Sequence, residues 1–402
     1  MPYDVRPLDL ADPARAQAEL ARVGADPAGV AKMRDKAGFL ALKATGLKSA
    51  AANILKQEML SVGGDAAVGR WVINCSQERS DVVILGTRKQ HRALVRKLRP
   101  QPFGLRSLAA EIEAVLAGAA REHELAWRGG VLRLWARPHV MAALNVTPDS
   151  FSDGGDYLTP GAALDRALAM VAEGADIVDV GGESTRPGSE GISAEEELRR
   201  VLPVIEHLAP RVPVPISVDT LKAAVARAAA SAGASIVNDV SGLEGDPGMA
   251  TAVAETGCNL VVMHMRGTPR TMQAQTQYGD LVGEVFRGLR ERVERAVAAG
   301  IARERVIVDP GIGFGKDAAG NLTLLRRLAE FRALGCPVLV GASRKSFIGK
   351  VLGIDRPKDR LEGSLAAAVL AVSHGAHIVR VHDVASTRRA VDLAWAVLRA
   401  EG

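Results

Sequence analysis

Apolar and polar positions follow one repeating order along most of this chain. From about residue 139 onward, a short β-branched apolar run is followed by a turn rich in Gly, Asp, Asn and Ser, and then by an Ala- and Leu-rich stretch with helical periodicity. Continuous apolar runs are typical of parallel strands that are buried on both faces. Eight such strands are predicted, at residues 139–146, 175–182, 215–220, 234–240, 259–264, 305–310, 337–343 and 377–383.

Eight strand-then-helix units in about 260 residues match a (β/α)8 barrel in count and length. A doubly wound open sheet is the structural alternative. The barrel is favoured because no GxGxxG motif opens a first strand-to-helix turn, and because polar residues recur at the end of nearly every strand. The expected fold class is therefore α/β, with a (β/α)8 TIM barrel over residues 138–402 and a small α/β N-terminal domain of unknown role over residues 1–137.

The N-terminal region has a different pattern. Ala- and Leu-rich helical stretches are predicted up to about Leu60, followed by two strands at 70–76 and 81–87, a basic helix at 88–98 and another helix at 105–118. His91, Cys75 and the neighbouring Lys and Arg residues suggest a ligand site, but a solvated helix face is the favoured interpretation.

Composition narrows the choice of partners and location. The 51 Lys and Arg residues exceed the 46 Asp and Glu residues by a net charge of +5, which is spread along the chain, and aromatic residues make up only 3%. Nucleic-acid binding would require clustered basic residues and stacking aromatics, so small anionic substrates are expected instead. The three separated cysteines lack metal-ligand spacing, and we find neither a signal peptide nor a run of about 18 apolar residues, so a cytoplasmic protein that does not bind membranes is expected.

Polar residues at the strand ends are the candidates for chemistry, because the C-terminal ends of barrel strands meet at one mouth. A single Asp or Asn there is more often a turn or helix cap. Asp219, Asn238 and Asp309, however, would all point into a pocket, where an unpaired carboxylate costs several kcal/mol. A flat heterocycle with ring N–H and amino donors would pair with them. Positive side chains that suit an anionic leaving group or second substrate are Arg186, Lys345, Arg380 and His382.

Seven motifs occur in order on these strand ends: LNVTPDSFSDGG, DVGGESTRPG, VDT, ND, DPGIGFGK, SRKSFIG and RVHDV. By these motifs, residues 138–398 closely resemble the dihydropteroate synthase family of pterin-binding TIM barrels. The resemblance implies condensation of 6-hydroxymethyl-7,8-dihydropterin pyrophosphate with p-aminobenzoate to 7,8-dihydropteroate and pyrophosphate, the step of folate biosynthesis that sulfonamides inhibit. It also implies Mg²⁺ as cofactor and a homodimer formed through barrel helices.

The same resemblance implies roles for individual residues. The pterin would be bound by Asp219, Asn238, Met263, Asp309, Lys345 and Arg380. The pyrophosphate would be bound by Asn145, Arg380 and His382, and Asn145 would also help to hold Mg²⁺. The p-aminobenzoate pocket would be formed by Thr185, Arg186, Pro187, Phe314, Lys345 and Ser346. A mobile loop over the site would carry Phe151 and Asp153. The residues expected to act in catalysis are Asn145, Asp219, Lys345, Arg380 and His382.

The implied reaction is consistent with the residue types at the mouth. Pyrophosphate leaves an activated methylene carbon, and the electron-rich pterin can carry the resulting positive charge, so its loss can precede attack by the weakly nucleophilic amine. Such a step needs charge stabilisation at the pterin and at the departing pyrophosphate. It needs no strong base, which agrees with a mouth that lacks a nucleophile–base pair of the Ser/His kind.

Two other functions remain as alternatives. The methyltetrahydrofolate–corrinoid methyltransferases share the fold and a similar Asp/Asn pocket, but they hold neither pyrophosphate nor aminobenzoate, and this chain shows no attached corrinoid-binding domain. A pterin-binding paralogue that has lost catalysis is the second alternative. Degenerate copies usually lose loop residues first, whereas Asn145, Arg186, Lys345 and His382 are all present.

Overall fold

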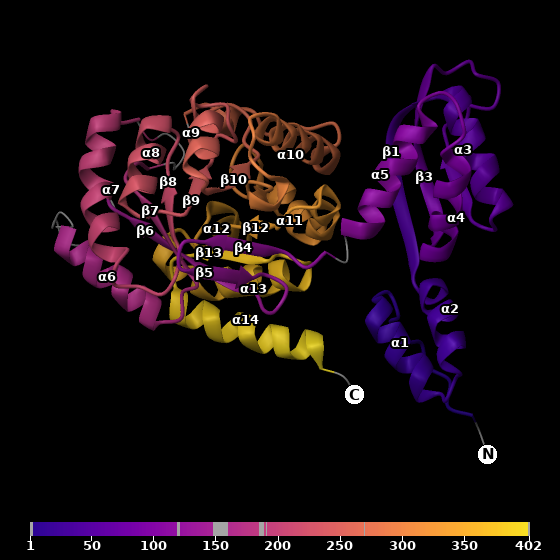
Figure 1. The fold of residues 1–402 in the computed structure, drawn as a ribbon, viewed down its shortest axis with the longest axis horizontal. Helices are drawn as coiled ribbons and strands as arrows, with labels where there is room; N and C mark the ends of the chain where they lie inside the picture. Colours follow the sequence, from indigo (N-terminus) through magenta and orange to yellow (C-terminus); the bar gives the residue numbers. More distant parts are fainter. Residues whose placement is uncertain are drawn as a thin grey trace. The chain divides into compact units, whose positions relative to one another are not determined.

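The chain folds into two compact units, Met1–Ala120 and Arg121–Ala400, which are described separately. The computed structural model describes residues 3–118, 121–147, 160–184, 189, 191–268 and 270–400 (Figure 1). The division between the units lies at Ala120 and Arg121, whereas the sequence patterns placed a boundary at 137 and 138.

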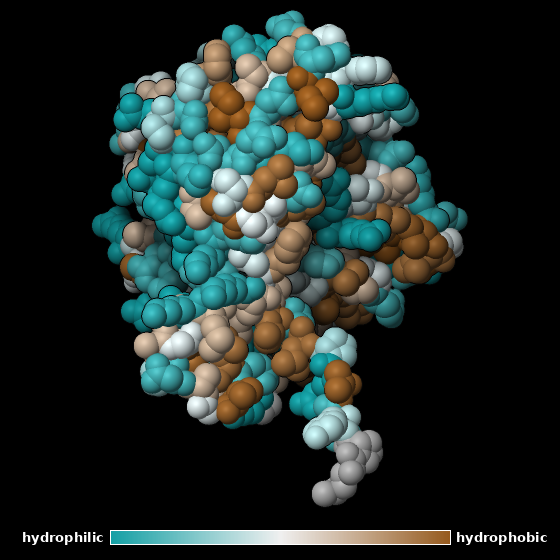
Figure 2. Space-filling view, turned by 90° about the vertical axis from the view of Figure 1, so that its right-hand side faces the viewer, coloured by the Kyte–Doolittle hydropathy of each residue, from teal (hydrophilic) through white to brown (hydrophobic). Residues whose placement is uncertain are grey.

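The first unit is a three-stranded antiparallel sheet with helices packed on one face. The sheet order is β1-β3-β2, and the strands are β1 (Phe39–Lys48), β2 (Asp65–Val68) and β3 (Arg79–Thr87). The helices are α1 (Pro13–Arg22), α2 (Pro27–Ala37), α3 (Ser49–Ser61), α4 (Arg88–Leu98) and α5 (Leu105–Gly118). One apolar core joins α3, α4 and α5 to the inward-facing residues of β2 and β3. In the space-filling view, hydrophilic residues cover most of the face shown, interrupted by separate hydrophobic patches (Figure 2).

The N-terminal predictions were partly right. The strand at 81–87 and the helices at 88–98 and 105–118 are confirmed. The strand predicted at 70–76 is wrong: these residues form turns, Ile73 is 83% exposed, and Cys75 has a left-handed φ of 57°. The helical stretches predicted up to about Leu60 are right for α1, α2 and α3, but residues 39–48 between them form strand β1, whose alternate residues are exposed. Its Ala and Leu content favours a helix, but pairing with β3 along nearly its whole length overrides that propensity.

The basic helix α4 has a core-facing stripe. His91, Leu94, Val95 and Leu98 are buried, and the Nε2 atom of His91 lies 2.9 Å from the Leu40 carbonyl oxygen. Burial lowers the pKa of His91. His91 is therefore a core residue of this unit, and the basic residues occupy the opposite face of the helix, as the sequence indicated.

The second unit is a closed eight-stranded parallel barrel, which confirms the predicted fold. The sheet order is β11-β10-β9-β8-β7-β6-β13-β12, and a parallel bridge between Val308 and Val338 joins its two ends. The strands are β6 (His139–Asn145), β7 (Ile177–Gly181), β8 (Ile216–Asp219), β9 (Ile236–Asp239), β10 (Asn259–Met263), β11 (Val306–Asp309), β12 (Leu339–Val340) and β13 (Ile378–Val381).

Helices surround the barrel and bury the outward-facing side chains of its strands in one large apolar core (Figure 1). These helices are α6 (Pro160–Ala172), α7 (Ala194–Leu208), α8 (Ala223–Ala232), α9 (Met249–Thr256), α10 (Leu281–Ala298), α11 (Ala318–Arg326), α12 (Ser346–Leu352), α13 (Leu361–Ser373) and α14 (Val384–Arg399). Short 3₁₀ helices are η2 (Met272–Ala274), η3 (Arg303–Arg305), η4 (Leu328–Leu334) and η5 (Pro357–Asp359). Of the helices in the described ranges, none combines the length and the apolar character that crossing a bilayer requires.

A β-hairpin closes the N-terminal end of the barrel. Its strands are β4 (Glu124–Trp127) and β5 (Gly130–Arg133). Leu125 of the hairpin and Leu134 after it are buried against inward-facing residues near the start of the barrel strands: Met141, Ile177, Ile236, Val261, Ile307, Leu339 and Ile378. The Asn259 side chain also donates a hydrogen bond of 2.9 Å to the Ala126 carbonyl oxygen. These contacts make residues 121–137 part of the barrel unit.

Candidate active site at the C-terminal end of the barrel

Strand register places the first candidate residues in one row. Asn145 of β6 pairs with Gly181 of β7, Gly181 pairs with Asp219 of β8, and Asp219 pairs with Asn238 of β9. A Cβ added to Gly181 would lie 3.7 Å from Asn145 Oδ1 and 3.5 Å from Asp219 Cβ. The glycine therefore leaves a small space between the amide and the carboxylate.

Arg380 lies on β13, the strand next to β6, and its side chain reaches the carboxylates of β7 and β8. Its Nε atom donates a hydrogen bond of 2.6 Å to Asp179 Oδ2, and its Nη2 atom donates one of 2.8 Å to Asp219 Oδ2. The Asn238 amide donates a bond of 3.1 Å to the same Asp179 oxygen. Asp179 is fully buried on β7 and orients both Arg380 and Asn238. Asp179 was not among the residues predicted from the sequence, although a carboxylate inside the apolar run IVDVG indicates a buried charge that needs a partner.

Within the described part of the chain, two carboxylate oxygens in this network lack a hydrogen-bond partner. Asp179 Oδ1 and Asp219 Oδ1 are both buried and unpaired among the described residues. Burial raises the pKa of Asp219 to about 7, although the Arg380 guanidinium lowers it. Burial also opposes the charge of Arg380, but Asp179 and Asp219 outweigh it and raise the pKa of the guanidinium. Because leaving a buried acceptor unpaired costs about 1–3 kcal/mol, more for a charged group, the arrangement suits a ligand with N–H donors.

Asp309 and Lys345 form a second charged group at the same mouth. The Gly311 N–H donates a hydrogen bond of 2.7 Å to Asp309 Oδ1, and burial raises the pKa of Asp309 while Lys345 lowers it. The Lys345 ammonium donates to the Ile312 carbonyl oxygen and lies 4.4 Å from the centre of the Phe314 ring. Burial lowers the pKa of Lys345 to about 8, while Asp309 opposes this shift.

Gly313 makes room for that lysine. Its φ of +85° lies in the left-handed region, and a Cβ there would come within 2.9 Å of Lys345 Cδ. Any larger residue at this position would displace the Lys345 side chain, and it would also be strained by the backbone conformation. This explains why the loop after β11 needs glycine between Ile312 and Phe314.

Hydrogen bonds and an ion pair connect the loop after β12 to the loop after β13. The Ser343 hydroxyl lies 3.1 Å from His382 Nδ1 and accepts a bond of 3.3 Å from the His382 N–H. Arg344, whose φ is 58°, forms an ion pair with Asp383. Ser346 is the first residue of α12. The SRKS and RVHDV segments, which are far apart in the sequence, therefore form one rim.

An apolar cluster around Met263 and the buried side chain of Lys316 also lie at this end of the barrel. Met263 packs with Val240, Met265 and Met272, and Leu221 and Phe314 border this cluster. Behind it, the Lys316 ammonium donates a bond of 2.8 Å to the His264 carbonyl oxygen and lies 3.1 Å from His264 Nδ1. Burial lowers the pKa of Lys316 well below its ordinary value and that of His264 to about 2. This pair holds the loop after β11 against β10.

The sequence-predicted candidates divide into two groups. Ten of them lie at or just after the C-terminal ends of the barrel strands. His382 contacts Ser343 there. The other nine are Asn145, Asp219, Asn238, Met263, Asp309, Phe314, Lys345, Ser346 and Arg380. Five lie outside the described residues: Phe151, Asp153, Thr185, Arg186 and Pro187.

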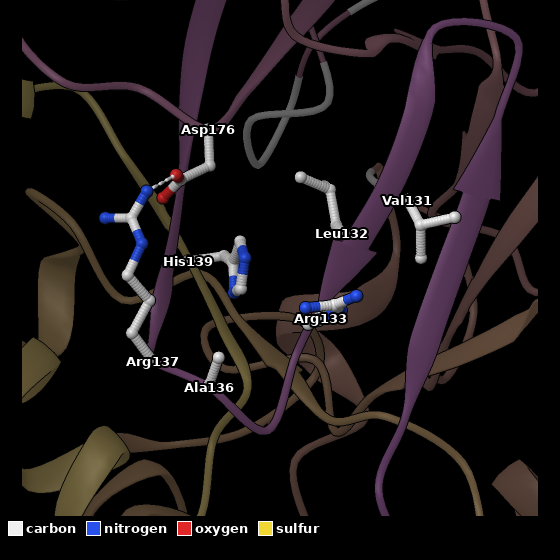
Figure 3. Close-up of a pocket in the computed structure, with 7 residues that line it drawn as sticks. All are labelled: Val131, Leu132, Arg133, Ala136, Arg137, His139 and Asp176. Atoms are coloured by element: carbon white, nitrogen blue, oxygen red, sulfur yellow. Dashed lines mark hydrogen bonds and ion pairs between the residues drawn. The ribbon is translucent and has the colours of Figure 1, made fainter.

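A polar cavity lies at the opposite, N-terminal end of the barrel unit (Figure 3). Its volume is about 450 Å³, and it is lined by Val131, Leu132, Arg133, Ala136, Arg137, His139 and Asp176. Arg137 forms an ion pair with Asp176, which also accepts a bond of 2.8 Å from the Val140 N–H. Because the hairpin and the strand starts form this cavity, it is separate from the charged groups at the C-terminal mouth.

Comparison with known proteins identifies related barrels. The family described as "Pterin binding enzyme" matches residues 141–382. The dihydropteroate synthase of Escherichia coli K12 is 52% identical over 266 residues, which are 66% of this chain and 94% of the relative. A dihydropteroate synthase structure from Xanthomonas albilineans with 4-aminobenzoic acid is 47% identical, covers 70% of this chain and 100% of its own, and has a TM-score of 0.66.

One similar protein extends over the N-terminal unit as well. A probable bifunctional folylpolyglutamate synthase/dihydropteroate synthase of Halobacterium salinarum is 45% identical over 393 residues. The match covers 97% of this chain and 46% of that protein. The N-terminal unit therefore has a counterpart in that relative.

Proposed function

This chain belongs to the dihydropteroate synthase family of pterin-binding enzymes, and we propose that the charged mouth of its barrel is where the two substrates are joined. The enzyme condenses 6-hydroxymethyl-7,8-dihydropterin pyrophosphate with p-aminobenzoate, and it releases 7,8-dihydropteroate and pyrophosphate. The observation that carries the site assignment is the buried carboxylate of Asp219, which has one oxygen paired with Arg380 and the other without a partner among the residues that the structure describes.

The pterin ring would bind edge-on to this network. Its ring N–H and amino groups are donors that Asp219 Oδ1, Asp309 and the Asn238 amide oxygen can accept. Arg380, held by Asp179 and Asp219, would present its planar guanidinium to the ring face, and Lys345 would bind an acceptor atom of the pterin. Met263 supplies an apolar surface for the ring. Because Asp179 fixes both Arg380 and Asn238, the pocket is organised before substrate arrives.

The pyrophosphate group would lie toward Asn145, Arg380 and His382. An Mg²⁺ ion fits here, since such ions are commonly held by one or two protein oxygens together with substrate phosphates. The Asn145 carboxamide oxygen borders the space over Gly181, and in the described residues no group of three or more His, Cys, Asp or Glu could hold a metal without the substrate. When bound, Mg²⁺ would neutralise charge on the departing pyrophosphate.

The reaction would begin with loss of pyrophosphate. As the bond to the methylene carbon breaks, positive charge spreads into the pterin ring, where the Asp219 and Asp309 carboxylates stabilise it. Arg380 and His382 stabilise the negative charge on the leaving group. The amine of p-aminobenzoate then attacks the methylene carbon, and its proton passes to solvent, so that no side chain has to act as a strong base.

The second substrate would bind beside the pterin. Phe314 offers a ring face next to the Lys345 ammonium, and Ser346 opens α12 at the same rim. Thr185, Arg186 and Pro187 complete the proposed p-aminobenzoate pocket from outside the described residues. An aromatic ring with one carboxylate matches this combination of an aromatic face, a hydroxyl and cations.

A homodimer is the assembly we propose. Large apolar side chains are exposed on α12, α13 and α14, namely Val351, Leu352, Leu370, Leu393 and Val397. Exposed large apolar side chains on neighbouring helices favour a protein–protein interface there.

A turnover assay tests the proposed function. We expect full-length protein with Mg²⁺, pterin pyrophosphate and p-aminobenzoate to form dihydropteroate and pyrophosphate in equal amounts. Asp219→Ala should lose about 10²–10³ in kcat/KM, because a preorganised charged partner is removed. Excess chelator should stop the reaction. Absence of product from folded wild-type protein would favour the non-catalytic paralogue, and methyl transfer from methyltetrahydrofolate would favour the corrinoid methyltransferases.

A further inference from the structure

In the loop after β11, the peptide unit between Ile312 and Gly313 is held from two sides. Its N–H, which belongs to Gly313, donates a hydrogen bond of 2.7 Å to Asn321 Oδ1 on α11. Its carbonyl oxygen, which belongs to Ile312, accepts a hydrogen bond from the Lys345 ammonium. Of the acceptors in the described part of the chain, this oxygen is the one within hydrogen-bond distance of that ammonium. Asn321 and Lys345 are therefore connected through one peptide unit.

The surroundings of the Asn321 side chain determine its orientation. The residue is buried, and its Nδ2 atom donates hydrogen bonds to the main-chain carbonyl oxygens of Asp317, at 2.8 Å, and Lys316, at 3.3 Å. Because carbonyl oxygens can only accept, the amide nitrogen must face them, which leaves Oδ1 for the Gly313 N–H. All three hydrogen bonds go to main-chain groups of residues 313–317, so the carboxamide fixes the path of this segment.

A planar trans peptide unit couples its two ends. The N–H and C=O bonds of such a unit point in opposite directions, so a fixed N–H also fixes the direction of the carbonyl oxygen. Gly313 has a φ of +85°, and glycine adopts positive and negative φ about equally well. Without Asn321 to hold the N–H, the unit could turn over at low cost, and the Ile312 carbonyl oxygen would then point away from Lys345.

Other contacts hold the two ends of this loop. At its start, the Gly311 N–H donates a hydrogen bond of 2.7 Å to Asp309 Oδ1. At its end, the Lys316 ammonium donates one of 2.8 Å to the His264 carbonyl oxygen. Neither contact reaches the central peptide unit, so its direction depends on the bond to Asn321.

We propose that Asn321 is a positioning residue for Lys345: it holds the Ile312–Gly313 peptide unit so that the carbonyl oxygen fixes the Lys345 ammonium at the mouth of the barrel. The proposal rests on the proposed function, in which Lys345 contributes to both substrate pockets. It assigns Asn321 no contact with either substrate. The side chain acts through the peptide unit, on the opposite side of that unit from Lys345.

A double-mutant cycle tests this connection. We expect Asn321→Ala to lower kcat/KM for p-aminobenzoate about tenfold in the wild-type background, because the peptide unit that holds the Lys345 ammonium is released. In the Lys345→Met background, the same substitution should lower it less than about twofold, since the ammonium that Asn321 positions is absent. A merely structural role would lower kcat/KM by the same factor in both backgrounds.

The pH dependence of kcat/KM gives a second readout. Burial lowers the pKa of Lys345 to about 8, so kcat/KM for p-aminobenzoate should fall above this pH as the ammonium loses its proton. An acceptor that bonds the charged form favours that form, so Asn321→Ala should move this alkaline limit about 0.5–1 pH unit lower. The charged groups that face Lys345 are unchanged in this variant, namely Asp309, Asp219, Arg380 and the buried Lys316.

Two further variants separate positioning from folding. Asn321→Asp keeps an acceptor for the Gly313 N–H but loses the amide donors, so it should keep kcat/KM within about threefold of the wild type while its melting temperature falls. Asp317→Ala is the matched control: it removes the cap of α11, where Asp317 Oδ1 accepts a bond of 2.7 Å from the Gly320 N–H, and it leaves Asn321 in place. It should lower the melting temperature without changing kcat/KM or the alkaline limit.

The outcomes are distinguishable. If wild type and Asp317→Ala form no dihydropteroate, the proposed function fails, and with it the role of Asn321. If both are active, the positioning role alone is overturned by an equal loss in the two backgrounds, by a wild-type kcat/KM for Asn321→Ala or by an unmoved alkaline limit. If Asn321→Ala does not fold, Asn321→Asp decides: kcat/KM within about threefold of the wild type supports the role, and a folded protein that has lost more than about tenfold overturns it.

Discussion

The carboxyl group of Asp219 makes pterin binding sensitive to pH. Because burial raises its pKa to about 7, a large share of this group is protonated just below neutrality in the substrate-free enzyme. A protonated carboxyl cannot accept the donors of the pterin through both oxygens. The KM for pterin pyrophosphate should therefore rise about tenfold per pH unit below 7 and level off above it.

A series of assays between pH 5.5 and 8.5 checks this expectation, with the p-aminobenzoate KM followed in parallel. Stability gives an independent readout. A carboxyl whose folded pKa is raised contributes stability at low pH that is lost as the pH rises through about 7. Asp219→Asn removes this loss, so its melting temperature relative to the wild type should increase from pH 5.5 to pH 8. A pterin KM that is independent of pH would contradict the assignment of Asp219 as an acceptor.

At single positions, the sequence pattern identified polar residues that stand at the ends of apolar strands. Asp219, Asn238 and Asp309 stood out because each ends an apolar strand, and the structure places them at the mouth. Asp179 had the same signal and was missed, because it lies within the strand run rather than at its end. The ion pairs that Lys222 forms with Glu183 and with Glu197 of α7 could not be found in this way, since no local pattern encodes contacts between distant elements.

Among the elements, the barrel strands were predictable, whereas only one of the N-terminal strands, at 81–87, was predicted. Barrel strands are buried on both faces, so they form continuous apolar runs that a sequence pattern detects. Strand β1 is half exposed and made of good helix formers, so only its pairing with β3 decides its conformation. The hairpin of β4 and β5 was also overlooked, although the sequence ELAWRGGVLR alternates around a Gly-Gly turn.

The hairpin supplies a prediction at this scale. Leu125 is buried against the lower layer of the barrel interior, so Leu125→Ala should lower the free energy of unfolding by about 2–5 kcal/mol. Its kcat/KM should stay close to the wild-type value, because the catalytic residues lie at the other end of the strands. Urea denaturation and turnover of the same samples measure both quantities. A large loss of activity in a fully folded variant would mean that the two ends of the barrel are coupled.

At the scale of the whole molecule, the described site residues belong to one unit, and the other unit contains none of them. Every described site residue lies in the unit Arg121–Ala400, which has its own core and includes the hairpin that fills its N-terminal end. The first unit has a separate core around α3, α4 and α5. We expect the first unit to contribute assembly or stability rather than contacts in the transition state. The sequence indicated two regions, but their division depends on hairpin packing that only the three-dimensional structure reveals.

We expect residues 121–402 to contain the complete dihydropteroate synthase site. Turnover of a protein that begins at Arg121, measured beside the full-length chain, tests it most directly. We expect kcat/KM values for both substrates within about threefold of full length, because no transition-state contact is removed. A protein that begins at Leu134 should be less stable, since it lacks the hairpin. A folded 121–402 protein that has lost more than about tenfold in kcat/KM would contradict the claim and place part of the site in the N-terminal unit.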